Sequence, residues 1–227
     1  MAQRSKPKNT PVALKVLFIG NSFTARNDLR GLIARMAASR VQSLEHRLIS
    51  AGGASLRTHW NAGKAAAAIQ EGRYDYVVLQ ELSTLPIKNA KRMHENVRLF
   101  DQAIKSAGAK TALYLTWARQ HTPESQGPIT DAYASIGREL GATVIPVGVA
   151  WQDVLAKPKT LVLHDRDQSH PSLAGSYLAA CVFLAVLFRE NPIGIEVDVA
   201  GLNDHDRRLL QKAAWRASKS FSAGMPG

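Results

Sequence analysis

The chain has 227 residues, a length that fits one domain with some elaboration better than two. With 45 % hydrophobic and 21 % charged residues, its composition excludes a disordered chain, a collagen and a disulfide scaffold. The single cysteine, Cys181, excludes an internal disulfide and a cysteine-rich zinc site. The net charge is +11, but the basic residues are dispersed and no basic run alternates with aromatic residues. We therefore expect a solvated basic surface and no nucleic-acid partner.

Residues 1–11 are basic and lack the apolar core of a signal peptide, so we expect a flexible tail and a cytoplasmic protein. Beyond the tail, apolar runs alternate with amphipathic stretches. Val12–Ile19 lies between Pro11 and Gly20 and is typical of a buried strand. Further strands are predicted over residues 44–49, 74–80, 111–116 and 143–147. Helices are predicted over residues 29–40, 56–70, 90–107, 129–140, 172–189 and 204–220.

The helix over residues 172–189 is the most apolar segment of the chain. It contains Gly175, Ser176 and Tyr177, and its apolar part is shorter than the about 20 residues that a membrane-spanning helix needs. We therefore predict a buried core helix, with Cys181 as a packing residue, and no transmembrane segment.

Strands that alternate with helices predict right-handed crossovers and a mostly parallel sheet covered on both faces. The expected fold is a three-layer α/β/α sandwich with five strands. Residues 12–227 are expected to form one domain that includes the last helix. In such open sheets, ligands bind beyond the carboxyl ends of the strands. The segments that follow each predicted strand are therefore the places to look for a functional site.

The first predicted strand is followed by Gly20, Asn21 and Ser22. Glycine allows a sharp turn at a strand end, which places Ser22 at the rim of the sheet near the start of a helix. A hydroxyl there lies close to helix N–H dipoles that favour developing negative charge. The motif is neither the Gly-x-Ser-x-Gly nucleophile elbow nor a phosphate-binding loop, because the required glycines and lysine are absent.

Asp167 and His170 lie three positions apart, directly before Pro171 and the apolar helix. In a tight turn, that spacing lets a carboxylate reach the imidazole of its own loop. Hydrolysis by a serine needs such a pair, because a histidine takes the serine proton and a carboxylate orients the histidine. Asp165 is an alternative orienting carboxylate whose five-residue offset fits this arrangement less well.

Taken together, a serine after the first strand and an Asp-x-x-His block before the last long helix resemble the SGNH hydrolase superfamily, also called GDSL-type esterases and lipases. The resemblance covers about residues 12–188 and implies a flavodoxin-like sheet. It further implies that Ser22 is the nucleophile, His170 the general base and acid, and Asp167 the orienting carboxylate. The implied enzyme is a serine esterase that needs no cofactor and no metal.

The same resemblance implies an oxyanion hole built from three segments. The backbone N–H of Ser22 supplies one donor, and a glycine after the second strand supplies another. Gly53 fits that position best, and its neighbour Gly52 remains an alternative. The family usually has Gly-x-Asn-Asp after the third strand, whereas this chain has Gln80 and Glu81 there. Gln80 is therefore expected to donate in place of the asparagine, with Ser83 as the alternative.

Trp60, Trp117 and Arg119 follow strand ends and are expected to line the rim of the substrate site. The absence of a long apolar lid segment favours a small acyl ester as substrate, such as an O-acetyl group on a carbohydrate. Two alternatives stay open. One is lysophospholipase, thioesterase or lipase action on longer acyl chains. The other is a non-catalytic basic α/β module that binds an acidic polymer.

Overall fold

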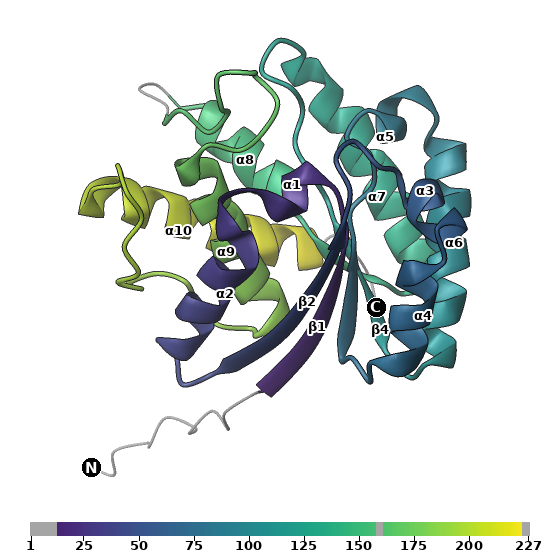
Figure 1. Ribbon diagram of the computed structural model, residues 1–227. Coiled ribbons are helices and arrows are strands. Elements are labelled where there is room, and N and C mark those ends of the chain that lie inside the picture. The colour runs from purple at the N-terminus through teal and green to yellow at the C-terminus, as the bar shows by residue number, and fades with distance from the viewer. Residues whose placement is uncertain (1–12, 158–160, 224–227) are drawn as a thin grey trace.

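The computed structural model describes residues 13–157 and 161–223, so the predicted tail at residues 1–11 lies outside the described part. Five parallel strands form one sheet in the order β2-β1-β3-β4-β5. The strands are β1 (Ala13–Gly20), β2 (Ser43–Ser50), β3 (Tyr76–Leu79), β4 (Lys110–Tyr114) and β5 (Thr143–Ile145). β1 lies inside the sheet and pairs with both β2 and β3, which fixes the carboxyl end of β1 between two neighbouring loops (Figure 1).

Helices cover both faces of the sheet, as the alternating pattern predicted. One face is covered by α2 (Leu29–Ala38), α8 (Val147–Leu155), α9 (Leu173–Leu187) and α10 (Asp204–Ala223). The other face is covered by α3 (Leu56–Asn61), α4 (Lys64–Glu71), α6 (Ala90–Ser106) and α7 (Gln126–Leu140). The described residues also form four short helical turns, which are α1 (Ser22–Ala25), η1 (Arg26–Asp28), α5 (Leu85–Lys88) and η2 (Pro123–Ser125). The three-layer α/β/α sandwich is confirmed.

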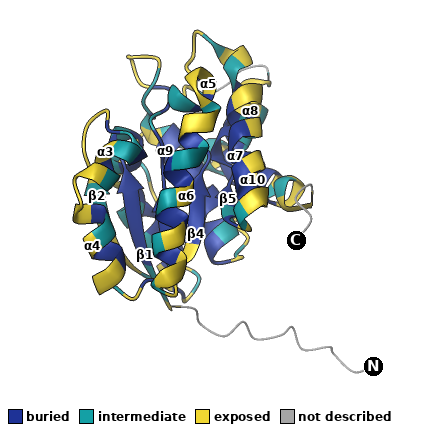
Figure 2. Cartoon of the chain, turned by 90° about the vertical axis from the view of Figure 1, so that its right-hand side faces the viewer, coloured by how far each residue is buried: buried dark blue, intermediate teal, exposed yellow. Residues whose placement is uncertain are grey.

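Two apolar cores hold the layers together, one on each side of the sheet. Successive residues of β1 point to opposite faces, so Val16 and Phe18 enter one core while Leu17 and Ile19 enter the other. Figure 2 shows the strands β1, β4 and β5 buried between partly exposed helices. Strands that are buried on both faces have continuously hydrophobic sequences. The strands could therefore be predicted from the apolar runs in the sequence.

The apolar helix α9 lies inside the protein, and almost its whole length is buried, Cys181 included. The prediction of a buried core helix is therefore confirmed. Among the described residues, no helix is both long enough and apolar enough to cross a membrane.

Three details differ from the predicted elements. The predicted helix over residues 56–70 is two helices, because Gly63 adopts a left-handed φ of 73° between α3 and α4. The predicted strand over residues 143–147 ends at Ile145, and Val147 begins α8, which was not predicted. The apolar residues of α8 are close enough in sequence to the strand to hide the change from strand to helix.

Candidate active site

The predicted nucleophile lies in a tight turn between β1 and α1. The Asn21 side chain caps α1 by accepting a hydrogen bond from the backbone N–H of Phe23 at 3.1 Å. Asn21 also donates its side-chain amide to the carbonyl of Ala54 at 3.0 Å, which ties this turn to the loop after β2. Ser22 is the first residue of α1 and is half-buried. Its hydroxyl is thus held at the carboxyl end of a central strand.

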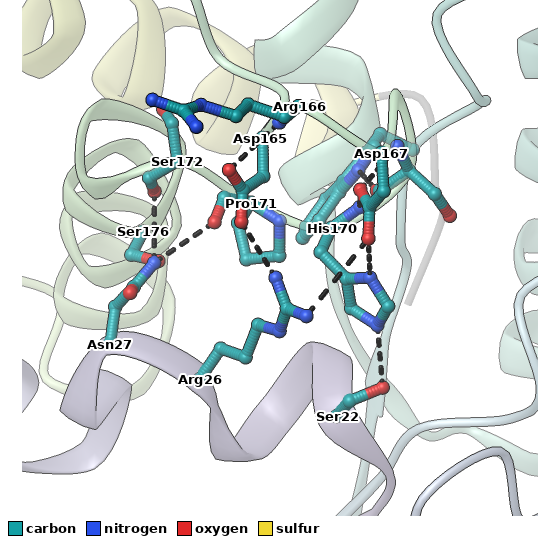
Figure 3. A network of polar contacts seen from close by, with 12 residues as sticks. Ser22, Arg26, Asn27, Asp165, Arg166, Asp167, His170, Pro171, Ser172 and Ser176 are labelled. Carbon is teal, nitrogen blue, oxygen red and sulfur yellow. Dashed lines mark hydrogen bonds and ion pairs between the residues drawn. The ribbon is translucent and has the colours of Figure 1, made fainter.

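A loop between α8 and α9 brings the predicted base to this hydroxyl. The loop closes on itself, because the N–H of Asp165 donates to the carbonyl of His170 at 2.7 Å. The Oγ of Ser22 lies 2.7 Å from the Nε2 of His170, although the two residues are 148 positions apart in sequence. The Nδ1 of His170 contacts a carboxylate oxygen of Asp167 (Figure 3). The structure therefore brings the three predicted residues together in one line of hydrogen bonds.

Asp167 is held as an anion although its side chain is 43 % exposed. Desolvation acts to raise the pKa of this carboxyl, but hydrogen bonds from the ring and N–H of His170 and from the N–H of Ser169 outweigh it. The pKa of Asp167 is therefore well below its usual range. Because an anionic carboxylate accepts from Nδ1–H, the Nε2 of a neutral His170 is left to accept the Ser22 proton.

Asp165, the alternative carboxylate, lies in the same loop but contacts other groups. It accepts a hydrogen bond from the Arg26 guanidinium at 2.7 Å and one from the N–H of Arg166 at 2.8 Å. Arg26 also lies 4.0 Å from Asp167, between the two carboxylates (Figure 3). This geometry favours Asp167 as the partner of His170 and gives Asp165 the role of holding Arg26.

Asn27 joins the segment that carries Ser22 to the start of α9, a role that the sequence analysis did not predict. It adopts a left-handed φ of 54° and donates to the carbonyl of Pro171 at 2.9 Å and to the hydroxyl of Ser176 at 2.9 Å. Its partners lie more than 140 positions away in the chain, so no local pattern could have identified them. Arg26 was missed for the same reason.

The predicted oxyanion glycine lies in the exposed loop after β2. Gly53 has a left-handed φ of 65°, and a methyl group at either Gly52 or Gly53 would meet no atom within 4 Å. The loop is anchored to the Ser22 turn on both sides, because the N–H of Ala51 donates to the carbonyl of Gly20 at 3.4 Å and Ala54 accepts from Asn21.

The sequence predicted that Gln80 is an oxyanion donor, whereas its described contacts support the backbone around Ser22. Its side chain is fully buried, and its carbonyl oxygen accepts from the N–H of Asn21 at 2.9 Å and from the hydroxyl of Thr24 at 3.0 Å. Its amide nitrogen donates to the carbonyl of Glu81. The longer stem of glutamine turns the amide under the Ser22 turn, where it supports the backbone. Ser83, the alternative, is also buried.

The structure does not place the predicted tryptophans at a substrate rim. Trp60 is half-buried and packs edge-on against Phe100, a core residue of α6. Trp117 is 2 % exposed and lies between Phe23 and Trp151, with ring centroids 5.0 and 3.8 Å away. Both indoles are large apolar surfaces that cores accept more readily than solvent does.

Arg119 is exposed, and it lines a pocket of about 230 Å³ together with Trp151 and His164. Phe23 packs against His170 with ring centroids 5.2 Å apart, and Trp117 joins Phe23 to Trp151. A run of ring contacts therefore links the pocket that Arg119 lines to His170, and the place of Arg119 at a substrate rim stays a prediction.

Among residues 13–157 and 161–223, no group of three or more histidine, cysteine, aspartate or glutamate side chains is arranged to bind a metal ion.

Comparisons with known proteins bear on the fold and the family. No family model matches the chain, and no curated protein matches it. A solved structure described as a candidate SGNH hydrolase from Slackia heliotrinireducens is 27 % identical, with a TM-score of 0.68, over 77 % of this chain and 99 % of that one. A DUF4886 family protein from Bacteroides uniformis is 20 % identical, with a TM-score of 0.73, over 90 % and 94 %. A lipase/acylhydrolase from Enterococcus faecalis is 17 % identical, with a TM-score of 0.62, over 80 % and 100 %.

These likenesses extend over most of the chain. The motif residues Ser22, Asp167 and His170 stand at the strand and helix ends where the sequence resemblance expects them. Because the fold, the motif order and the likeness to an SGNH protein agree, the chain belongs to the SGNH hydrolase superfamily.

Proposed function

We propose that this protein is a serine esterase in which Ser22 is the nucleophile, His170 the general base and acid, and Asp167 the orienting carboxylate. The observation that carries the proposal is the continuous contact from the Ser22 hydroxyl through the His170 ring to the Asp167 carboxylate. Hydrolysis of ester bonds is the chemistry of the superfamily, and this arrangement is the one that such hydrolysis requires.

In the first half of the reaction, Ser22 Oγ attacks the ester carbonyl carbon while its proton passes to His170 Nε2. The tetrahedral intermediate collapses, and its C–O bond breaks as His170 protonates the leaving alcohol. In the second half, water attacks the acyl-enzyme, gives its proton to His170, and the acid leaves as Ser22 regains its hydrogen. Asp167 stays anionic and stabilises the imidazolium that forms in each half.

The oxyanion is proposed to sit against the backbone N–H groups of Ser22 and Gly53. Neither N–H group donates to another described residue. The glycine loop is anchored beside the serine by Asn21, which favours a shared position for both donors. Removal of one such donor typically costs about 10²–10³ in kcat.

The substrate is proposed to be a small acyl ester, such as an O-acetyl group, on a bulky alcohol such as a carbohydrate. The exposed Gly52, Gly53 and Asp167 leave the neighbourhood of Ser22 open at the surface. An open site admits a large alcohol but offers little apolar wall to a long acyl chain. The excess of basic residues favours encounter with acidic substrates.

The test is turnover of p-nitrophenyl esters from acetate to long-chain acids by wild type, Ser22→Ala and Ser169→Ala. Ser169 offers a matched control, because its hydrogen bonds to Asp167 and Trp117 come from its backbone N–H and carbonyl, which alanine keeps. We expect wild type and Ser169→Ala to prefer acetate, and Ser22→Ala to show only background hydrolysis. Equal rates for Ser22→Ala and wild type would refute the proposal. A preference for long chains would keep the triad and overturn the substrate class.

A further inference from the structure

Two buried polar residues, Gln80 and Glu81, directly follow β3 and lie between the two loops of the proposed site. Both are 0 % exposed. Gln80 holds the Ser22 turn by accepting the N–H of Asn21. Glu81 reaches the other loop, because its Oε1 accepts the N–H of Leu56, the first residue of α3, at 2.9 Å. One dipeptide therefore contacts both segments that carry the proposed oxyanion donors.

Burial of the Glu81 carboxylate destabilises the folded protein unless hydrogen bonds compensate for the lost hydration. Oε1 also accepts from the N–H of Leu82 at 2.7 Å, and Oε2 accepts from the Asn96 side chain at 2.9 Å. Asn96 in turn accepts from Arg57 Nε at 2.9 Å, so a cation supports the far end of the chain of contacts. Burial nevertheless raises the pKa of Glu81 above its ordinary value.

The Leu56 contact controls the end of the loop that contains Gly53. The two residues between Gly53 and Leu56 are also held by hydrogen bonds: the carbonyl of Ala54 accepts from Asn21, and the side chain of Ser55 caps α3. His59, one turn into α3, donates its Nε2–H to the carbonyl of Gly20 at 2.7 Å. Without the Glu81 contact, only the contacts of Ala51, Ala54 and His59 would hold the Gly53 loop and α3 to the Ser22 turn, so the position of the loop would be less tightly fixed.

We propose that Glu81 is a positioning residue of the oxyanion hole, holding the Gly53 loop in register with the Ser22 turn. No asparagine stands directly after β3, where this chain has Gln80 and Glu81. In this proposal, these two residues fix backbone donors instead of supplying a side-chain donor. This inference rests on the proposed function, because it concerns the same oxyanion. It assigns Glu81 a role in kcat without contact to the substrate.

The main test variant is Glu81→Gln, which keeps the volume of the side chain and removes one acceptor. Its new amide NH₂ would face the Asn96 NH₂, so the two donors would repel. Asp101→Asn is the matched control. Asp101 is a buried carboxylate on α6 that accepts from Thr111 at 2.7 Å, near the amino end of β4 and away from the site.

The measurements are kcat and KM for p-nitrophenyl acetate and the free energy of unfolding in urea. For Glu81→Gln we expect kcat to fall about 10- to 100-fold, part of the loss from deleting a whole oxyanion donor, with KM changed less than about threefold. For Asp101→Asn we expect lower stability and a kcat within about threefold of wild type. A folded Glu81→Gln variant with wild-type kcat would overturn the proposal, as would an equal kcat loss in Asp101→Asn.

Rescue separates positioning from simple destabilisation. The double variant Glu81→Gln/Asn96→Asp exchanges donor and acceptor between the two positions and leaves a carboxylate beside Arg57. We expect it to recover kcat to within about fivefold of wild type, as coupled neighbours do in double-mutant cycles. If Glu81→Gln does not fold, Asn96→Ala removes one donor to Glu81, and kcat is expected to fall about threefold to tenfold. An unchanged kcat in that variant would also refute the role of Glu81.

The Ser22→Ala variant keeps the two proposals distinguishable. If Ser22→Ala is as active as wild type, the proposed function fails. If Ser22→Ala is inactive and folded Glu81→Gln has wild-type kcat, the triad stands and only the positioning role of Glu81 is lost.

Discussion

Three glycines beside Ser22 should respond very differently to the same added methyl group. At Gly20, a Cβ would lie 2.6 Å from the Gln80 carbonyl oxygen and 2.7 Å from the Thr24 hydroxyl, both in a fully buried site. At Gly53, space is open but φ is +65°. At Gly52, space is open and φ lies outside the left-handed region. Gly20→Ala therefore tests steric crowding, and Gly53→Ala tests backbone strain. Gly52→Ala serves as the control, because it introduces neither.

The magnitudes follow from these differences. Gly20→Ala overpacks the turn and should cost about 1–3 kcal/mol in the free energy of unfolding. Gly53→Ala places a side chain at a left-handed φ and should cost about 1–2 kcal/mol. Gly52→Ala should lie between no effect and about 1 kcal/mol of stabilisation, because alanine restricts the unfolded chain.

Activity should rank in the same way, for a different reason. Gly20→Ala displaces Gln80 from the N–H of Asn21, and Gly53→Ala moves a proposed oxyanion donor. We expect both to lower kcat for p-nitrophenyl acetate by about tenfold or more, since a lost donor costs about 10²–10³. Gly52→Ala should keep wild-type kcat. Urea unfolding and steady-state kinetics on the three variants measure both rankings. If Gly52→Ala loses more activity than Gly53→Ala, the assignment of Gly53 as the donor is wrong.

The remaining predictions concern the carboxylates of the loop and the single thiol. Asp167→Asn should lower kcat by roughly 10²–10⁴-fold while Asp165→Asn stays within about tenfold, and equal losses in steady-state kinetics would contradict the assignment. Because the pKa of Asp167 is lowered in the folded protein, its carboxylate stabilises the fold at pH values above its unfolded pKa of about 3.9. This stabilisation is lost as the pH falls through the folded pKa. Urea unfolding between about pH 5 and pH 2 should therefore show a steeper acid loss for wild type than for Asp167→Asn, and parallel curves would refute it. Burial raises the pKa of Cys181, so a disulfide reagent at about pH 8 should label it only after unfolding, and rapid labelling of the native protein would argue against its burial.

The sheet could be predicted from sequence because its strands are buried on both faces. Apolar runs such as Val16–Ile19 leave few alternatives, and Gly72, Gly108 and Gly141 mark where helices end before the next strand. The helix α8 could not be predicted in the same way. It begins two residues after β5, and its first residues continue the apolar run of the strand, so the change of period has no visible boundary.

The candidate site shows the same division between local and distant contacts. Ser22 and the Asp167–His170 pair were found because each stands in a short motif at an element boundary. The contacts of Gln80 could not be predicted, because the direction of its side chain depends on the space beside Gly20, where an added methyl would lie 2.6 Å from its oxygen. Arg26, Asn27 and Glu81 contact partners in distant segments of the chain, so local sequence patterns could not predict their roles.

The separation of Ser22 and His170 in the chain has a consequence for how activity is acquired during folding. Closing a loop of 148 residues costs entropy on the order of 4 kcal/mol, and most of the sheet must be in place before the two side chains meet. Helices such as α6 and α7 form from local contacts and can precede this closure. In a refolding experiment, circular dichroism should therefore recover before ester turnover does. The contact between Ser22 and His170 would then report a late, long-range step of folding.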